Sequence, residues 1–271
     1  PVSAEYLHDA LTSAQDSGAQ ALIIRLNTPG GLDPSMRLII KDITGATIPV
    51  VVYVSPSSGR AASAGVFITM AAHVAAMAPG TNIGAAHPIV IGGGETDKTM
   101  KEKIENDSVA YLKSIASQRG RNVTWAEDAV RKSLSVTEQE ALKLKIIDLV
   151  AEDMPALLKQ LDGRSISLQS GPRHLHTADA AVREFPMGLR LEFLNTLSDP
   201  NIAYLLMTLG TIGLIAELYN PGAILPGVVG AISLVLAFYS FQSLPVNYAG
   251  VLLFLLGIVF LILEASVTSY G

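Results

Sequence analysis

The sequence predicts an α/β domain with a mainly parallel sheet and flanking helices, followed by a C-terminal α-helical transmembrane region. Short apolar runs alternate with amphipathic stretches through the first two-thirds of the 271 residues, and this order is typical of parallel sheets. The last quarter of the chain differs. Between Asp199 and Gly271 there are three acidic residues and no lysine or arginine, which is typical of membrane-spanning segments.

The composition supports this division and excludes several kinds of function. Hydrophobic residues make up 49% of the chain and charged residues only 16%, which is too apolar for an ordinary soluble domain. A net charge of −5 without a basic run gives no indication of nucleic-acid binding. Because the chain has no cysteine, disulfides, thiolate metal sites and cysteine catalysis are excluded. It starts at Pro1 without a methionine or a leader, which is consistent with removal of a targeting segment.

Hydrophobic periodicity and turn residues predict the elements of the first part. Apolar residues recur at helical spacing over 4–17, and Gly18 can end that helix. The run 50–54 is continuously apolar and β-branched, which is typical of a strand buried on both faces. Thr137-Glu-Gln-Glu140 is a capping box that opens a helix. In full, we expect strands at 21–26, 50–54, 73–78 and 146–151, and helices at 4–17, 34–43, 63–70, 99–119, 125–132, 141–145 and 154–161.

The predicted domain boundaries follow the composition. We expect the α/β domain at 1–157, a linker with an interfacial amphipathic segment at 158–198, and the transmembrane domain at 199–271. The linker is polar and carries His174 and His176, which have no third metal ligand nearby and are expected to be solvated. Three apolar segments make up the transmembrane domain, and the first and third are short for a spanning helix of ~20 residues. They cover 202–218, 223–241 and 249–263.

Residues 50–65 give the strongest indication of chemistry. The run V-V-V-Y-V-S-P-S-S-G-R-A-A-S-A-G predicts a strand, a turn and the start of a helix, with Ser63 in the first helical turn. The free backbone N–H groups and the positive dipole end at that position can hold a developing oxyanion. Ser63 is therefore a candidate nucleophile, while a small serine among alanines also suits close helix packing.

A serine nucleophile also needs an oxyanion hole and a base. The turn Asn27-Thr-Pro-Gly-Gly31 follows a strand, which is where parallel α/β folds hold ligands, so the N–H groups of Gly31 and Ala64 are the natural oxyanion pair. Two residues compete for the role of base. Lys103 lies on the helix at 99–119 and would have to act as the neutral amine, whereas His87 is a histidine, whose ordinary pKa of ~6.5 requires no such change. The residues alone leave both open.

Three motifs stand at the ends of predicted strands. They are Leu26-Asn-Thr-Pro-Gly-Gly31, Gly59-Arg-Ala-Ala-Ser-Ala-Gly65 and Met77-Ala-Pro-Gly-Thr-Asn-Ile-Gly84. Together they resemble the protease domain of long NfeD proteins, also called stomatin operon partner proteins, in the ClpP, signal-peptide-peptidase and crotonase superfamily. The resemblance runs from Pro1 to about Asp153, and the stretch 217–227 resembles the family's membrane region.

The resemblance implies a ClpP/crotonase-like fold and a membrane-anchored serine endopeptidase with a Ser-Lys dyad. Ser63 would be the nucleophile and Lys103 the base. The stretch Lys103-Ile-Glu-Asn-Asp-Ser-Val-Ala-Tyr111 fits the family's lysine motif, and the neighbouring lysines do not. Relatives with a Ser-His-Asp triad carry their histidine about where His87 lies, so a Ser-His peptidase is the alternative.

The resemblance also implies apolar peptide substrates and a stomatin/flotillin (SPFH) family membrane partner. It implies a homo-oligomer, a dimer or larger, in the lipid bilayer, with the protease domain outside the cytoplasm. We expect no cofactor, no metal and no nucleic acid. We expect the family's first strand to precede Pro1 and its small β-barrel domain to follow the membrane helices.

Two other classes of function stay open. One is a non-catalytic membrane scaffold that binds stomatin-like assemblies. The other is a crotonase-like acyl-CoA enzyme, which shares the backbone oxyanion hole but does not need a paired serine and lysine. We also expect the glycine-rich segment 92–97 to be a mobile loop beside the cleft, able to hold Lys103 away from Ser63.

Overall fold

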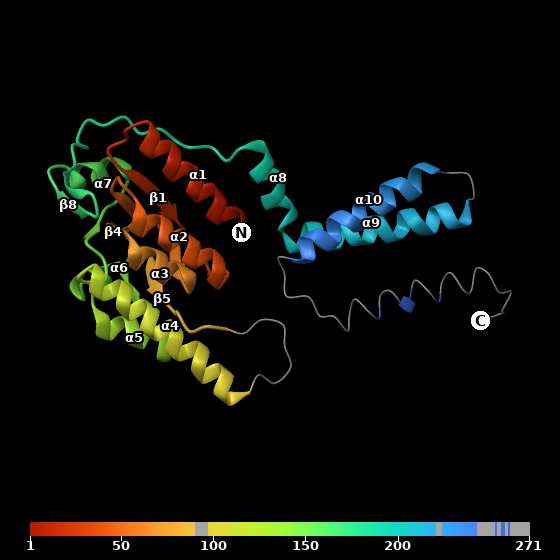
Figure 1. Ribbon diagram of the computed structural model, residues 1–271, viewed down its shortest axis with the longest axis horizontal. Coiled ribbons are helices and arrows are strands. Elements are labelled where there is room, and N and C mark those ends of the chain that lie inside the picture. Colours follow the sequence, from red (N-terminus) through yellow and green to blue (C-terminus); the bar gives the residue numbers. More distant parts are fainter. Residues whose placement is uncertain (90–96, 221–223, 243–252, 254–255, 258–259, 261–271) are drawn as a thin grey trace. The chain divides into compact units, whose positions relative to one another are not determined.

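The computed structural model describes residues 1–89, 97–220, 224–242, 253, 256–257 and 260. The chain divides into two compact units, which are described separately (Figure 1). Unit 1 comprises Pro1–Ile89 and Asp97–Met187, and unit 2 comprises Val90–Thr96 and Gly188–Gly271. The loop expected at 92–97, apart from Asp97, and most of the apolar segment 249–263 lie outside the described residues.

Unit 1 contains a four-stranded parallel sheet. Its strands lie in the order β1-β2-β4-β7, with Ile24 beside Val52 and Val52 beside Ala75. They are β1 (Leu22–Leu26), β2 (Val50–Val54), β4 (Val74–Met77) and β7 (Leu149–Val150). The predicted fold class, an α/β fold with a mainly parallel sheet and flanking helices, is confirmed.

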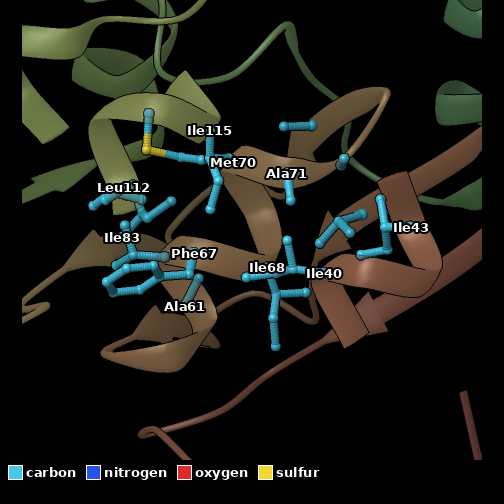
Figure 2. Packing of buried hydrophobic residues seen from close by; sticks show 14 of the residues in the cluster. Ile40, Ile43, Ala61, Phe67, Ile68, Met70, Ala71, Ile83, Leu112 and Ile115 are labelled. Carbon is cyan, nitrogen blue, oxygen red and sulfur yellow. The ribbon is translucent and has the colours of Figure 1, made fainter. Parts of the chain in front are cut away.

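Strand β2 is buried along its whole length because both faces of the sheet are covered. Val50, Val52 and Val54 belong to the larger core cluster, whereas Val51 and Tyr53 belong to a second cluster on the other face. Successive strand residues point to opposite faces, so a strand covered on both sides is apolar throughout. Figure 2 shows side chains of the larger cluster, from α2, α3, α4 and β5 among others, pointing towards one another.

The helices of unit 1 begin and end close to the predicted residues. Gly18 and Gly120 both have a φ of +66° and follow α1 and α4, as expected of helix-ending glycines. The capping box is confirmed, because Thr137 accepts the Glu140 N–H and the Glu140 carboxylate accepts the Thr137 N–H. The helices are α1 (Val2–Asp16), α2 (Asp33–Gly45), α3 (Ala64–Ala71), α4 (Lys98–Gln118), α5 (Val123–Arg131), α6 (Glu138–Lys143) and α7 (Met154–Leu161).

A small second sheet stands where the main strands end. Its order is β3-β5-β6, with β5 parallel to β3 and antiparallel to β6. Thr28, just after β1, makes a parallel bridge to Ala61 on the other side of β3. The strands are β3 (Arg60–Ala62), β5 (Asn82–Gly84) and β6 (Ser135–Thr137). The segment between β2 and α3 is thereby held by neighbours on both sides.

The stretch predicted as the start of a linker forms a β-hairpin instead. Strands β8 (Ser165–Leu168) and β9 (Gly171–His174) pair antiparallel. The hairpin supplies Ile166, and the residue after it is Leu175, both of which are buried in the second core cluster. The polar stretch therefore packs as part of unit 1. Among the described residues, no group of three or more His, Cys, Asp or Glu residues is placed to hold a metal ion.

Unit 2 contains α8 (Leu189–Leu197) and two longer helices, α9 (Pro200–Tyr219) and α10 (Ile224–Gln242). Both longer helices are long and apolar enough to cross a membrane, and they match the first two predicted segments. Only 11% and 28% of their apolar windows are buried, unlike the core helix of a soluble protein. Glycine allows them to touch, since a Cβ on Gly213 would lie 2.5 Å from the Pro226 oxygen.

Candidate active site

Ser63 stands between β3 and α3, at the N-cap of the helix. Its φ of 52° and ψ of −115° are unusual for a residue with a side chain and indicate strain. The Ser63 N–H donates to the Gly84 oxygen at 3.2 Å, and the Ser63 carbonyl accepts the Val66 N–H at 3.0 Å. The side chain is half-buried, and its Oγ makes no hydrogen bond to any described residue. The backbone is therefore fixed while the hydroxyl is left free.

The turn after β1 covers the Ser63 side chain. A Cβ on Gly30 would lie 3.1 Å from the Ser63 Cβ, and Gly30 has a φ of +150°, so both space and conformation require glycine. The next residue, Gly31, approaches Ala64, whose Cβ would lie 3.7 Å from a Cβ on Gly31. Thr28 holds the turn, because its Oγ1 accepts the Gly30 N–H at 3.1 Å and donates to the Gly30 oxygen at 2.7 Å. The structure thus brings together Ser63, Gly31 and Ala64.

Backbone hydrogen bonds join this turn to the strand that leads to Ser63. The Thr28 N–H donates to the Arg60 oxygen at 2.8 Å, and the Ala62 N–H donates to the Thr28 oxygen at 3.1 Å. A Cβ on Gly65 would lie 2.8 Å from the Thr28 Cγ2, so glycine lets the first turn of α3 rest on Thr28. Two motifs found in the sequence are therefore two halves of one packed structure.

Lys103 lies on the first half of α4, and its side chain is exposed. It makes no hydrogen bond or ion pair with any residue in the described part of the chain, Ser63 included. Asp107 lies one turn further along the same helical face, where it bonds to Arg37 of α2 instead of Lys103. Seven residues that precede α4, 90–96, lie outside the described ranges.

His87, the other candidate base, is exposed and follows β5 by three residues. Its Nδ1 lies 3.0 Å from the Val130 carbonyl oxygen. Because a carbonyl can only accept, this hydrogen bond requires the proton on Nδ1, and in the neutral ring Nε2 is then the acceptor nitrogen. In the described part of the chain no carboxylate bonds to His87, and no hydrogen bond links it to Ser63.

Arg37 was not anticipated from the sequence as part of the site. It lies in α2, the helix that follows the Gly31 turn, and its Nε and Nη2 donate to Asp33 at 2.9 Å and to Asp107 at 2.6 Å. Partial burial acts to lower the pKa of Arg37, but the hydrogen bonds and charges of the two aspartates outweigh it and raise that pKa. Arg37 therefore remains a cation that bridges α2 and α4.

Two aromatic rings continue this contact towards α3. The Arg37 guanidinium lies 4.3 Å from the centroid of the Tyr111 ring, within range of a cation–π interaction. The Tyr111 ring stacks on Phe67 of α3 with centroids 6.0 Å apart, one helical turn beyond Ser63. Burial raises the pKa of the Tyr111 hydroxyl. The spacing of Lys103, Asp107 and Tyr111 by four residues is the sequence signal that these three share a helical face.

The opposite end of α3 is held by charged groups. Arg119 Nε donates to the Ala71 oxygen at 2.8 Å, and Arg121 Nη2 donates to the Ala72 oxygen at 3.1 Å. Arg121 is buried and pairs with the Asp148 carboxylate at 2.8 Å. Burial, together with the charges of both arginines, lowers the pKa of the adjacent His73 to about 4.

Comparison with protein families agrees with both parts of the chain. Residues 2–184 match the family described as NfeD1b, N-terminal domain, and residues 201–271 match the NfeD integral membrane domain. The membrane-bound protease PH1510 of Pyrococcus horikoshii is 40% identical over 96% of this chain and 60% of its own length. The membrane protein NfeD1b of Bacillus subtilis is 31% identical over 96% of this chain and 58% of its own length. The chain thus spans about three-fifths of these relatives.

Solved structures of a similar protease match about 70% of this chain. A lysine-to-alanine variant of the 1510-N membrane-bound stomatin-specific protease, in complex with a substrate peptide, matches with a TM-score of 0.66 and 36% identity. It covers 72% of this chain and 90% of its own. A serine-to-alanine variant of that protease matches with a TM-score of 0.64 and 37% identity, over 69% of this chain and 91% of its own. Since one family match spans residues 2–184 and another the membrane helices, this chain is a member of the NfeD family of membrane proteins.

Proposed function

We propose that this chain is a membrane-anchored serine endopeptidase. Ser63 is the nucleophile, Lys103 is the base, and the backbone N–H groups of Gly31 and Ala64 form the oxyanion hole. The proposal is supported by the relative PH1510, which is named a membrane-bound protease, and by the serine and lysine variants made of the similar stomatin-specific protease.

The observation that carries the proposal is the conformation of Ser63 beneath Gly30. A serine at a φ of 52° is costly, so its backbone has to be fixed by the Gly84 and Val66 hydrogen bonds. This conformation holds a free hydroxyl at a helix N-terminus beside a glycine turn, which is the arrangement that acyl transfer requires.

The proposed reaction follows from this arrangement. The Ser63 Oγ attacks the carbonyl carbon of the peptide bond while the neutral amine of Lys103 takes the hydroxyl proton. The carbonyl oxygen becomes an oxyanion, which the N–H groups of Gly31 and Ala64 stabilise. When the C–N bond breaks, Lys103 returns the proton to the leaving amine. Water then hydrolyses the ester on Ser63, again with Lys103 as the base.

Substrate, partner and surroundings form part of the proposal. We expect apolar peptide substrates and a stomatin/flotillin-class membrane protein as partner, because the similar protease is named stomatin-specific. We also expect residues 199–271 to be a multi-pass anchor, the protease domain to lie outside the cytoplasm, and the protein to be a homo-oligomer. The resemblance of the sequence to the family supports these expectations.

His87 is the second candidate for the base, and one observation favours it. The Val130 carbonyl holds the proton on Nδ1 and leaves Nε2 as the acceptor nitrogen, which is the tautomer that a Ser-His pair uses. Two observations weigh against it. In the described residues no carboxylate orients His87, and the family's lysine motif surrounds Lys103.

The test is labelling by a serine-directed fluorophosphonate over a pH series, on the full chain in detergent or nanodiscs. We expect Ser63→Ala and Lys103→Ala to lose labelling and His87→Ala to keep it. Loss in His87→Ala with retention in Lys103→Ala would identify the Ser-His alternative. If wild type is not labelled at any pH, even with a stomatin-class partner present, the scaffold function would replace the peptidase.

A further inference from the structure

Arg37 links α2 directly to α4, and through one aromatic ring of α4 it is connected to α3. It belongs to α2, which directly follows the Gly31 turn, and it bonds to Asp107 of α4, the helix that carries Lys103. Its guanidinium also lies over Tyr111, whose ring stacks on Phe67 of α3. One side chain thereby connects the helices next to the proposed oxyanion turn, nucleophile and base.

The bond to Asp107 matters because Asp107 is the natural ion-pair partner of Lys103. Residues four apart on a helix are neighbours, and an aspartate there would attract a lysine. In this structure the Asp107 carboxylate bonds to Arg37 at 2.6 Å, and Lys103 has no ion pair with a described residue. A carboxylate beside a lysine favours its protonated form, which is inactive as a base.

We propose that Arg37 is a positioning residue for the base: it holds Asp107 away from Lys103 and ties α4 to α2. This inference rests on the proposed function, in which Lys103 takes the serine proton. By binding the Asp107 carboxylate, Arg37 keeps it from pairing with Lys103 and so from favouring the protonated amine.

Most of the other charged groups around this part of α4 have partners of their own. Asp33 bonds to Arg37 from within α2. On the side of α5, Arg131 bonds to Glu105, Asn106 and Glu127, and Glu127 also bonds to Lys113. Helix α3 has no charged residue. Lys98, Lys101 and Glu102 are the remaining charged residues on the first turns of α4, and all three are exposed.

The test measures the protonation of Lys103 directly, without requiring peptidase activity. The lysine amines of the full chain compete for a trace of acetic anhydride, which reacts only with unprotonated amines. Mass spectrometry reports the fraction of Lys103 that is acetylated at each pH. The variants are Arg37→Gln, Arg37→Lys, Asp107→Asn and the double variant Arg37→Gln with Asp107→Asn. Glu127→Gln is the matched control, because it removes the Lys113–Glu127 bridge between α4 and α5.

We expect Arg37→Gln to raise the pH midpoint of Lys103 acetylation by about 0.15–0.4 pH unit, as an ion pair between neighbours on a helix would. In the double variant the midpoint should return most of the way to the wild-type value, because position 107 then has no carboxylate to pair with Lys103. Arg37→Lys should stay close to wild type, and Glu127→Gln should not shift the midpoint. The midpoint of fluorophosphonate labelling should follow the same order.

Different results separate this inference from the proposed function. An unchanged acetylation midpoint in Arg37→Gln, or the same increase in the double variant, would overturn the role of Arg37 and leave the Ser-Lys proposal standing. If the acetylation midpoints move as expected but Lys103→Ala keeps full fluorophosphonate labelling, Lys103 is not the base. Arg37 would then affect the protonation of Lys103 without a role in catalysis.

Discussion

The two ends of helix α3 are built in opposite ways. At the N-terminal end Ser63 has a strained backbone, no side-chain cap and a free hydroxyl beneath a glycine turn. At the C-terminal end the last carbonyls are taken by Arg119 and Arg121, and Arg121 pairs with Asp148. Strain is tolerated only where the surrounding structure holds it. The comparison indicates that the C-terminal end of α3 is fixed by charged groups, while the N-terminal end keeps a strained residue with a free hydroxyl.

The largest effect we predict is at the N-terminal end. Gly30→Ala would place a methyl group 3.1 Å from the Ser63 Cβ and force a side chain into a φ of +150°. Displacing this turn would disrupt the proposed oxyanion hole, so fluorophosphonate labelling should fall by at least ~100-fold. The measurement is the labelling rate of the variant relative to wild type.

Gly45→Ala, at the end of α2, is the matched control for this prediction. No atom lies within 4 Å of its added Cβ, and the residue is not part of the proposed site. Labelling should therefore stay within a few-fold of wild type. Equal losses in Gly30→Ala and Gly45→Ala would contradict the steric argument.

The next effect is on stability at the C-terminal end. Arg121→Met should lower the free energy of unfolding by about 3 kcal/mol, because it leaves Asp148 and two carbonyls without their buried donor. The chain has one tryptophan, the buried Trp125 of unit 1, so its fluorescence in urea reports on this unit. Lys113→Met removes a more exposed pair and should cost about 0.5 kcal/mol or less. Similar losses of unfolding free energy in both variants would contradict the prediction that the buried pair matters more than the exposed one.

A smaller effect is expected from pH at the same end. The pKa of His73 is about 4 in the folded chain and 6.5 as its ordinary value, so between these values the unfolded chain binds the proton and the folded chain does not. The free energy of unfolding should therefore fall as the pH is lowered from 6.5 to about 4. His73→Gln keeps a hydrogen-bond acceptor for the Val50 N–H and should reduce this fall. The urea midpoints of wild type and His73→Gln at both pH values test this prediction. An equal fall of the midpoint in the two proteins would show that His73 is not its cause.

The smallest effect we predict tests whether the backbone of Ser63 is strained. Ser63→Gly should raise the free energy of unfolding by about 1 kcal/mol while abolishing labelling, because glycine accepts a positive φ. Ser63→Ala also abolishes labelling but keeps the strain, so its stability should stay near wild type. A gain in Ser63→Ala as large as in Ser63→Gly would mean that the hydroxyl, not the backbone, is unfavourable.

Local signals explain which elements could be predicted from the sequence. The strand at 50–54 was predicted with its observed bounds, because a continuous β-branched run has few alternatives. Ser63 was expected near the start of a helix and stands at its N-cap. The strand expected at 146–151 pairs only at Leu149–Val150, because Ile146 still bonds back to Ala141. Strands β5 and β6 have three residues each and pair with segments distant in sequence, whereas β8 and β9 have four residues each and form a local hairpin within a stretch too polar to predict strands.

The candidate site divides in the same way. Gly31 and Ala64 could be named because turn residues and helix starts leave a local signal, and the structure brings them together with Ser63. The bridge from Arg37 to Asp107 joins positions 70 residues apart and depends on how α2 packs beside α4. No local pattern specifies that packing, so the sequence alone did not indicate it.

The β8–β9 hairpin has a practical consequence for producing unit 1 as a separate fragment. Ile166 and Leu175 cover the face of the sheet formed by Val51, Tyr53 and Leu149. A truncation after Leu161 would expose this apolar face to water and promote aggregation. Expression fragments therefore have to extend past Thr177, whose N–H and hydroxyl tie the end of the hairpin to α7 and the residue after it.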